Sequence, residues 1–238
     1  LINLGNSVPK QIRECTVKIE KESKYQKLFN IDHLPDNIFV SPGTKAPNRM
    51  GFSKYASYIN SITEQKYGRP LILAMSADLS DSTNISGFAK GYGGARDKGF
   101  YEKKSNTKSP LFPQGITEFT NAGMMAGAAT VNFSAKPYES FSGFYGAVST
   151  YGSFSYLKYG PLRLFSQLAQ DSELKVGKII WVVGHSGPET AEDSRTHYGI
   201  FAPGVTQLFP NGSIINIHPW EHNEVAPSLT AALKTAVP

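Results

Sequence analysis

Residues 178–183 read Lys-Ile-Ile-Trp-Val-Val, an apolar run that lies between two glycines. A second run, Pro-Leu-Ile-Leu-Ala-Met, covers residues 70–75. Short apolar runs without alternation are typical of strands that are buried on both faces of a parallel sheet. These two stretches therefore predict strands at the centre of the fold. Residues 213–217, Ser-Ile-Ile-Asn-Ile, predict a further strand.

Helical patterns lie between and after these strands. Phe52, Tyr55 and Ile59 share one face of a predicted helix. The predicted helices cover residues 50–65, 118–130, 161–170 and 221–234. Strands that alternate with helices predict an α/β fold with a mostly parallel sheet and helices on both faces. Residues 84–114 and 132–159 show no regular period, and the first of these is predicted to be a long excursion.

The chain has 238 residues, enough for one large domain with its own core. Residues 1–50 are polar and interrupted at Pro42 and Gly43, which predicts a linker or extension with one or two short helices. Residues 51–238 are predicted to form the α/β domain. The first methionine is Met50, which favours a fragment of a longer protein.

The composition excludes several classes of protein. Hydrophobic residues make up 40% and charged residues 18%, unlike a disordered chain. The net charge is +5, but the basic residues are scattered, so we expect no nucleic-acid partner. Apolar runs are too short to span a membrane, so we expect no membrane partner. Cys15 is the only cysteine, which excludes an internal disulfide and favours a reducing, cytoplasmic location.

Three polar clusters follow the predicted strands. They cover residues 76–83, 185–197 and 218–222, and the last two contain His185, His197, His218 and His222. Ligands of open parallel sheets bind at the carboxyl ends of the strands. Polar side chains also fill loops without any function, but three clusters at one edge favour a binding site there.

One local motif suggests a different activity. Residues 183–188, Val-Gly-His-Ser-Gly-Pro, resemble the nucleophile elbow of serine hydrolases, with Ser186 as the nucleophile. Pro188 replaces the final glycine of that motif, and residues 189–195 lack the apolar period of the helix that should follow. A serine hydrolase is therefore a remote alternative. The histidines form no closely spaced pair on a helix, so we predict no metal site within the chain.

Three stretches, taken in order, resemble the central domain of the transketolase family, which binds the aminopyrimidine ring of thiamine diphosphate. They are Ser76-Ala-Asp-Leu followed by Ser82, Gly115-Ile-Thr-Glu-Phe119 at the start of an alanine-rich helix, and Ala191-Glu-Asp-Ser-Arg-Thr-His197. The resemblance covers about residues 50–236. It implies a pyrimidine-type thiamine diphosphate-binding fold and an enzyme that transfers a two-carbon ketol unit between sugars or sugar phosphates, as in pentose phosphate metabolism.

The resemblance makes Glu118 the catalytic residue. In this family a glutamate contacts the pyrimidine nitrogen N1′ and stabilises the imino tautomer, which removes the proton from C2 of the thiazolium ring. A carboxyl group suits this role where apolar surroundings favour its protonated form, and Met124 and Met125 are close in sequence. From the pattern alone, Glu118 is better explained as a first-turn acid stabilised by the helix dipole.

Further cofactor contacts follow from the same resemblance. Asp78 lies in the Ser-Ala-Asp motif, and residues 151–159 match an aromatic patch of the family. Phe154 is the first candidate for a contact with the pyrimidine ring and Tyr156 the second, because aromatic faces stack on flat heterocycles. Plain core packing is the alternative for each ring.

Substrate-binding residues are also implied. Asp193 and His197 match the acid and the histidine that hydrogen-bond the sugar hydroxyls, and His197 also counts as a catalytic residue. His185 and Ser82 match residues near the substrate phosphate.

Four positions depart from the family pattern. Lys54 and His218 stand where arginines are usual, and Ser194-Arg195 replaces a Gly-Pro pair. Only arginine offers a planar fork that binds phosphate through two parallel hydrogen bonds. These departures motivate a second hypothesis, a non-catalytic binding or assembly module that retains the fold.

The diphosphate group and Mg²⁺ are held in this family by a separate domain with a Gly-Asp-Gly motif and a downstream Asn. No such motif occurs in this sequence. We therefore expect that thiamine diphosphate and Mg²⁺ are bound together with a diphosphate-binding domain outside this chain, and that the family's C-terminal domain is outside it too. A homodimer, or association with such a domain or subunit, is the expected partnership.

Overall fold

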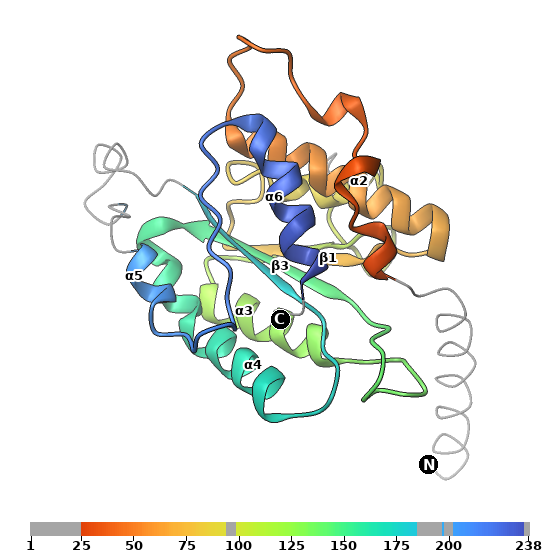
Figure 1. The fold of residues 1–238 in the computed structure, drawn as a ribbon, viewed down its shortest axis with the longest axis vertical. Helices are drawn as coiled ribbons and strands as arrows, with labels where there is room; N and C mark the ends of the chain where they lie inside the picture. The colour runs from red at the N-terminus through yellow and green to blue at the C-terminus, as the bar shows by residue number, and fades with distance from the viewer. Residues whose placement is uncertain (1–24, 94–98, 185–196, 198–201, 236–238) are drawn as a thin grey trace.

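The computed structural model describes residues 25–93, 99–184, 197 and 202–235 of the chain. At its centre lies a sheet of four parallel strands in the order β2-β1-β3-β4. The strands are β1 (Ile72–Ser76), β2 (Leu111–Phe112), β3 (Tyr145–Tyr151) and β4 (Ile179–Gly184). The larger helices are α2 (Asn48–Tyr67), α3 (Glu118–Thr130), α4 (Tyr159–Asp171) and α6 (His222–Lys234). Helices α2 and α6 cover one face of the sheet, while α3 and α4 cover the other (Figure 1), which confirms the predicted α/β fold.

Side chains of the strands alternate between the two helical layers. Ile72 and Ala74 of β1 belong to the core under α2 and α6, whereas Met75 packs against α3 and α4. In β3, Ala147 and Val148 divide between the two layers in the same way. Each buried aliphatic side chain contributes about 1.5–3 kcal/mol of burial free energy. The short apolar runs of the sequence are thus explained by burial on both faces.

The described part of the N-terminal extension packs against the sheet. It contains three 3₁₀ helices: η1 (Tyr25–Leu28), η2 (Ile31–His33) and η3 (Asp36–Ile38). Phe29 is buried, and its ring stacks on Tyr145 of β3 with centroids 6.0 Å apart. Arg69 donates a hydrogen bond of 2.8 Å to the Gly143 carbonyl and another to the Tyr25 hydroxyl. Residues 25–39 therefore contribute to the core, although the domain boundary near residue 50 stays a prediction.

Two glycines allow close contacts between layers. A Cβ atom at Gly146 of β3 would lie 3.2 Å from Cβ of Met125, so its absence lets α3 lie close against the sheet. A Cβ atom at Gly87, in η4 (Ile85–Ala89), would lie 2.6 Å from the carbonyl oxygen of Ser53 in α2. At Gly146 a larger residue would push α3 away from β3, and at Gly87 it would push α2 away from η4.

Asn60 of α2 binds backbone groups that the short strand β2 leaves without a strand partner. Its amide accepts a hydrogen bond of 3.0 Å from the Ile72 backbone N–H and donates one of 2.9 Å to the Ile72 carbonyl. A third bond, 3.0 Å long, runs to the Phe88 carbonyl. Asn60 is only 1% exposed, and these bonds satisfy a buried amide that would otherwise destabilise the fold.

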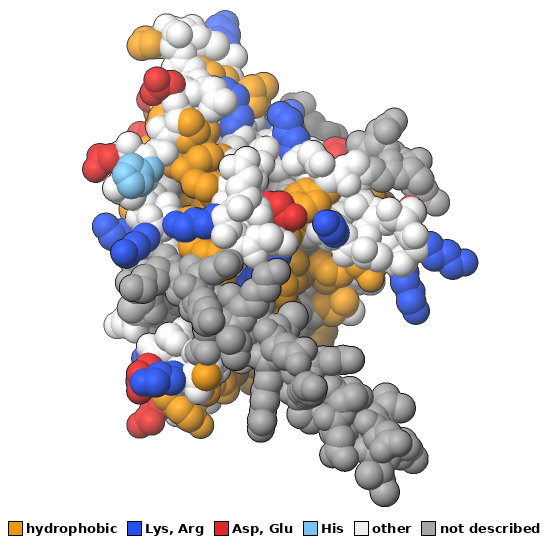
Figure 2. All heavy atoms as spheres, turned by 90° about the vertical axis from the view of Figure 1, so that its right-hand side faces the viewer, with side chains coloured by type: hydrophobic (Ala, Val, Ile, Leu, Met, Phe, Trp, Pro, Cys, Tyr) orange, Lys and Arg blue, Asp and Glu red, His pale blue; other side chains and the backbone are white. Residues whose placement is uncertain are grey.

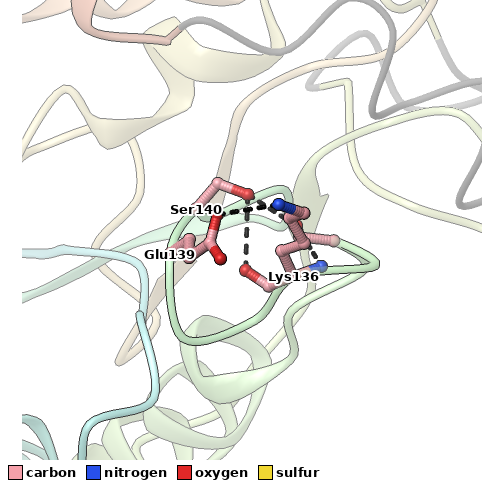
Figure 3. A network of polar contacts seen from close by, with 4 residues as sticks. Lys136, Glu139 and Ser140 are labelled. Carbon is pink, nitrogen blue, oxygen red and sulfur yellow. Dashed lines mark hydrogen bonds and ion pairs between the residues drawn. The ribbon is translucent and has the colours of Figure 1, made fainter.

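The loop between α3 and β3 lies at the amino ends of the strands. Its side chains form the network shown in Figure 3, in which the Ser134 and Ser140 hydroxyls lie 2.6 Å apart and Lys136 Nζ lies 3.1 Å from Glu139 Oε2. The amino ends of the strands, on the right in Figure 1, face the viewer in Figure 2, where Lys and Arg side chains are scattered among neutral ones. Among the described helices, none combines the length and hydropathy that a membrane span requires.

Two sequence predictions about strands are wrong. Residues 213–217 form no strand, because within the described residues no strand pairs with them, and Ile215 is 42% exposed. Conversely, residues 145–151 form the central strand β3 although they show no clear period. Small and hydroxyl side chains such as Gly146, Ala147 and Ser149 are buried on both faces of this strand, so it has neither the alternation nor the aliphatic run that identifies a strand in sequence.

Candidate functional site

The carboxyl ends of the strands, on the left in Figure 1, bring together several sequence-distant segments. They are the loop after β1, the start of α3, the 3₁₀ helix η5 (Gly152–Lys158) after β3, and the end of β4. Open parallel sheets bind their ligands at this edge. The structure therefore places the predicted residues of three different segments close to one another.

Glu118 is the first residue of α3 and is only 5% exposed. Its Oε1 accepts a hydrogen bond of 3.0 Å from the hydroxyl of Thr150, a buried residue near the end of β3. Oε2 accepts no hydrogen bond within the described part of the chain. The helix dipole stabilises a carboxylate at this end of α3, but it does not require the side chain to be buried against β3. Because only Oε1 is hydrogen-bonded, Oε2 can accept a hydrogen bond from one further polar group.

Lys158 and Asn121 form a second buried polar pair beside Glu118. Lys158 is the last residue of η5, is fully buried, and donates a hydrogen bond through Nζ to Oδ1 of Asn121. Asn121 lies one turn after Glu118 in α3. Burial lowers the pKa of Lys158 to about 7, and the nearby Glu118 carboxylate opposes this shift. The site therefore contains an ionisable acid and an ionisable base that are both removed from solvent.

Three aromatic rings lie close to one another at the same edge of the sheet. The His197 ring lies 5.6 Å from the Tyr151 ring and 5.5 Å from the Phe154 ring, with nearly perpendicular planes at Phe154. Tyr151 directly follows Thr150, the hydrogen-bond donor to Glu118. Tyr156, the second predicted ring contact, is 59% exposed and makes no ring contact with the described residues. The structure thus places Phe154 and His197, and not Tyr156, in one aromatic cluster.

Hydroxyl groups connect the loop after β1 to β3. The Ser149 hydroxyl donates to the Ser76 hydroxyl at 2.8 Å and accepts from the Thr83 hydroxyl at 2.8 Å. Asp78 adopts a left-handed backbone conformation with φ of 58° and has an exposed side chain. Ser82 is half-buried, and its carbonyl accepts a hydrogen bond of 3.3 Å from the Arg49 guanidinium. The predicted residues Asp78 and Ser82 therefore lie in one turn at the site's edge.

The two positions that replace family arginines lie in different surroundings. Lys54 is half-buried in α2, and within the described residues it forms no hydrogen bond or ion pair. His218 is exposed in the segment before α6, where it borders an open groove with Asn223 and Glu224. Arg49, which sequence reasoning did not single out, is the residue that places a guanidinium beside Ser82.

The predicted cluster of residues 218–222 does not follow a strand, which corrects the expectation that three clusters end three strands. His222 is 3% exposed, and its Nε2 lies 3.0 Å from the Ile38 carbonyl oxygen. Asn48, at the start of α2, donates a hydrogen bond of 2.7 Å to the Pro219 carbonyl. The segment therefore packs α6 against α2 and the N-terminal extension, and His222 has a structural role.

Several predicted residues lie outside the described residues. They are His185, Ser186, Asp193, Ser194 and Arg195, so their assignments stay predictions.

Sequence reasoning missed Thr150, Lys158 and Arg49. Lys158 gave one usable signal: it is the only charged residue between Glu139 and Arg163, in a stretch of aromatic, Ser and Gly residues. A lone lysine in such surroundings indicates either an exposed turn or a buried, functional amine. Thr150 and Arg49 contact residues that are distant in the sequence, and no local sequence pattern indicates such contacts.

Comparison with models of protein families gives a match. The family model described as "Transketolase, pyrimidine binding domain" matches residues 58–238, about three quarters of the chain. A search of the curated proteins finds no match. The matched range includes Glu118, Phe154 and His197, and all four strands of the sheet.

Proposed function

Because the chain belongs to the transketolase pyrimidine-binding domain family, whose members are thiamine diphosphate-dependent enzymes, we propose that it contributes to the transfer of a two-carbon ketol unit between sugars or sugar phosphates. The observation that carries this proposal is Glu118. Its carboxyl group is buried at the carboxyl edge of the sheet, and one oxygen is held by Thr150. That arrangement suits an acid that shares a proton with a ring nitrogen.

The residues at this edge fit an aminopyrimidine ring. Glu118 offers Oε2 for a ring nitrogen, and the half-buried Phe154 offers an aromatic surface at the same edge of the sheet. When bound, thiamine diphosphate would supply a nucleophilic thiazolium carbon for reaction at the carbonyl of a ketose. Glu118 would hold or release the proton at N1′, and Phe154 would orient the ring. Asp78 and Tyr156 are exposed, so a direct contact of either with the ring requires a rearrangement or a partner.

An anionic substrate is supported by the loop after β1. Arg49 places a guanidinium at the backbone of Ser82, and a guanidinium binds phosphate through parallel hydrogen bonds. We propose that Ser82, Arg49 and Lys54 contact the substrate phosphate, with His185 and His218 as further contacts. His197 and Asp193 would bind the sugar hydroxyls.

The proposed partner is a domain that binds diphosphate and Mg²⁺, from a second subunit or the same polypeptide. Three exposed apolar side chains lie near the site. They are Ile116 in the loop before α3 (78% exposed), Phe119 in α3 (64%) and Leu164 in α4 (68%). Phe119 directly follows Glu118, so this apolar surface continues from the site. Contiguous exposed apolar surface marks interaction sites, and a partner bound here would also exclude water from Glu118.

Calorimetry tests the proposal. The chain is combined with a diphosphate-binding domain of the family and titrated with thiamine diphosphate in the presence of Mg²⁺. Specific binding is expected for the parent protein and weakened binding for Glu118→Gln, with Glu139→Gln as the matched control at the opposite, exposed edge. If the parent releases no specific heat, or if Glu118→Gln binds as tightly as the parent, the proposal fails. The first result would favour a binding module that retains only the fold.

A further inference from the structure

Lys158 is buried more completely than a lysine usually is. Its exposed fraction is 0%, and it lies where η5 ends and α4 begins, between β3 and α3. Lysine side chains are almost never fully buried unless they are paired. An apolar residue at this buried position would serve packing at least as well, so the amine itself calls for an explanation.

The partners of Lys158 both belong to α3. Nζ donates to Oδ1 of Asn121, and the charge of Nζ interacts with the Glu118 carboxylate one turn away. Glu118 in turn accepts the hydrogen bond from Thr150. Glu118 and Lys158 are therefore both buried beside the first turn of α3, and the hydrogen bond to Asn121 fixes where Nζ lies.

The other ionisable groups near η5 are few. The described residues of β4 and α5 (Ala202–Thr206) carry none. The ionisable residues on the elements packed around Lys158 are Glu118 on α3, Tyr145 and Tyr151 on β3, Tyr156 within η5, Tyr159, Arg163 and Asp171 on α4, and His197 beside Phe154. Glu118 is the one whose charge acts directly on Lys158.

We propose that Lys158 is a positioning residue for Glu118. The Lys158 ammonium group stabilises the Glu118 carboxylate and thereby favours transfer of the shared proton to the bound ring nitrogen. This inference rests on the proposed function for its role in catalysis. The placement of Lys158 near Glu118 rests only on its burial and on its hydrogen bond to Asn121, one turn after Glu118 in α3. Burial lowers the pKa of Lys158 to about 7, which places its change of charge near neutral pH.

The pairing is tested by NMR titration of the chain without cofactor. The side-chain carboxyl carbon of Glu118 is followed in the parent protein, in Lys158→Met and in Lys158→Arg, and its signal is assigned by its loss in Glu118→Gln. Loss of a nearby positive charge disfavours the ionised form of a carboxyl group. The Glu118 signal is therefore expected to titrate at higher pH in Lys158→Met than in the parent, and as in the parent in Lys158→Arg.

Lys178 supplies the matched control. It is a second lysine whose pKa is lowered by burial, but it lies at the amino end of β4, where Nζ donates to the Thr235 carbonyl. Lys178→Met is expected to leave the Glu118 midpoint unchanged. An unchanged midpoint in Lys158→Met, or an equal rise in Lys178→Met, would overturn the inference.

A reciprocal measurement avoids any change at Lys158. The Cε signal of Lys158 is followed in the parent protein and in Glu118→Gln, which removes the carboxylate that raises its pKa. The Lys158 midpoint is expected to fall in Glu118→Gln, and a midpoint that does not fall would refute the pairing even if Lys158→Met does not fold. Because no cofactor is present, these outcomes are independent of the calorimetry. Loss of cofactor binding together with an intact Lys158–Glu118 coupling would reject only the proposed function.

Discussion

The two edges of the sheet both carry polar networks, but they differ in exposure. At the amino edge, Lys136 and Glu139 form an ion pair whose side chains are 68% and 69% exposed. At the carboxyl edge, Glu118 and Lys158 are 5% and 0% exposed. Water screens the first two charges and is largely excluded from Glu118 and Lys158, so charges at the carboxyl edge are screened much less. Exposure, and not the number of charges, therefore distinguishes a loop-ordering network from a candidate site.

The largest expected effect separates the edges by activity. In the chain reconstituted with a diphosphate-binding domain, Glu118→Gln is expected to lower ketol-transfer turnover by about 100-fold or more, since acid–base groups contribute roughly 10²–10⁴-fold. Glu139→Gln is expected to leave turnover unchanged because its carboxylate is solvated at the far edge. Steady-state rates of both variants beside the parent give the comparison. Turnover of Glu118→Gln equal to that of the parent would remove Glu118 from the mechanism.

The second prediction concerns stability and pH. The folded-state pKa of Lys158, about 7, lies below the 10.5 of an exposed lysine. Between these values the unfolded chain binds more protons than the folded chain, so the free energy of unfolding rises with pH, and below pH 7 the full penalty of burying the ammonium remains. Integrated from pH 7 to about pH 9.5, the contribution of Lys158 is roughly 2–3 kcal/mol.

Lys158→Met should remove this contribution. Urea unfolding at several pH values is expected to show a flatter pH dependence in Lys158→Met than in the parent. Lys178→Met provides a graded control, because burial lowers the pKa of Lys178 only to about 8 and its removal should flatten the curve less. An identical slope in the parent and in Lys158→Met would mean that the amine is not desolvated in solution.

The sequence predicts regular elements well and tertiary contacts poorly. Helix α3 begins and ends where its alanine-rich pattern does, and β4 coincides with the strongest apolar run. Strand β3 escaped prediction because its buried side chains are small or hydroxylic, and residues 213–217 were misassigned because a strand also needs a neighbour to pair with. A local pattern describes what a segment can form, whereas pairing is decided by the rest of the chain.

The candidate site shows the same division. Glu118 was predicted from motifs that resemble those of a family in their order along the chain, and Phe154 from an aromatic stretch that matches the same family. Thr150 and Lys158 lie 32 and 40 residues from Glu118 in the sequence, and their contacts arise only when β3 and η5 pack against α3. Hydrogen-bond partners of this kind have no periodic signature, so they could be identified only from the structure.

A third prediction tests the amino edge for stability. Asn132 donates hydrogen bonds to the Ser140 and Lys175 carbonyls and accepts one from the Ser142 backbone N–H. Asn132→Ala is expected to lower the free energy of unfolding by about 1–3 kcal/mol, since the backbone groups it binds lose their partner. Chemical denaturation measures this loss, and cofactor binding should be unaffected. A loss of cofactor affinity as large as that of Glu118→Gln would show that the two edges are not independent.

The smallest effect is expected for the ion pair of the amino edge. Lys136 Nζ and Glu139 Oε2 lie 3.1 Å apart in an i,i+3 arrangement, yet both side chains are more than two-thirds exposed. Such pairs contribute about 0–1 kcal/mol, because water screens the charges and ordering two long side chains costs entropy. Lys136→Ala is therefore expected to change the free energy of unfolding by less than about 0.5 kcal/mol, and 1 M NaCl should remove most of that difference by screening. The neighbouring hydroxyl pair of Ser134 and Ser140 does not depend on the charge and should keep the loop in place. A loss above about 1 kcal/mol that persists in high salt would mean that this pair is shielded from water, and exposure could then no longer explain why the two edges differ.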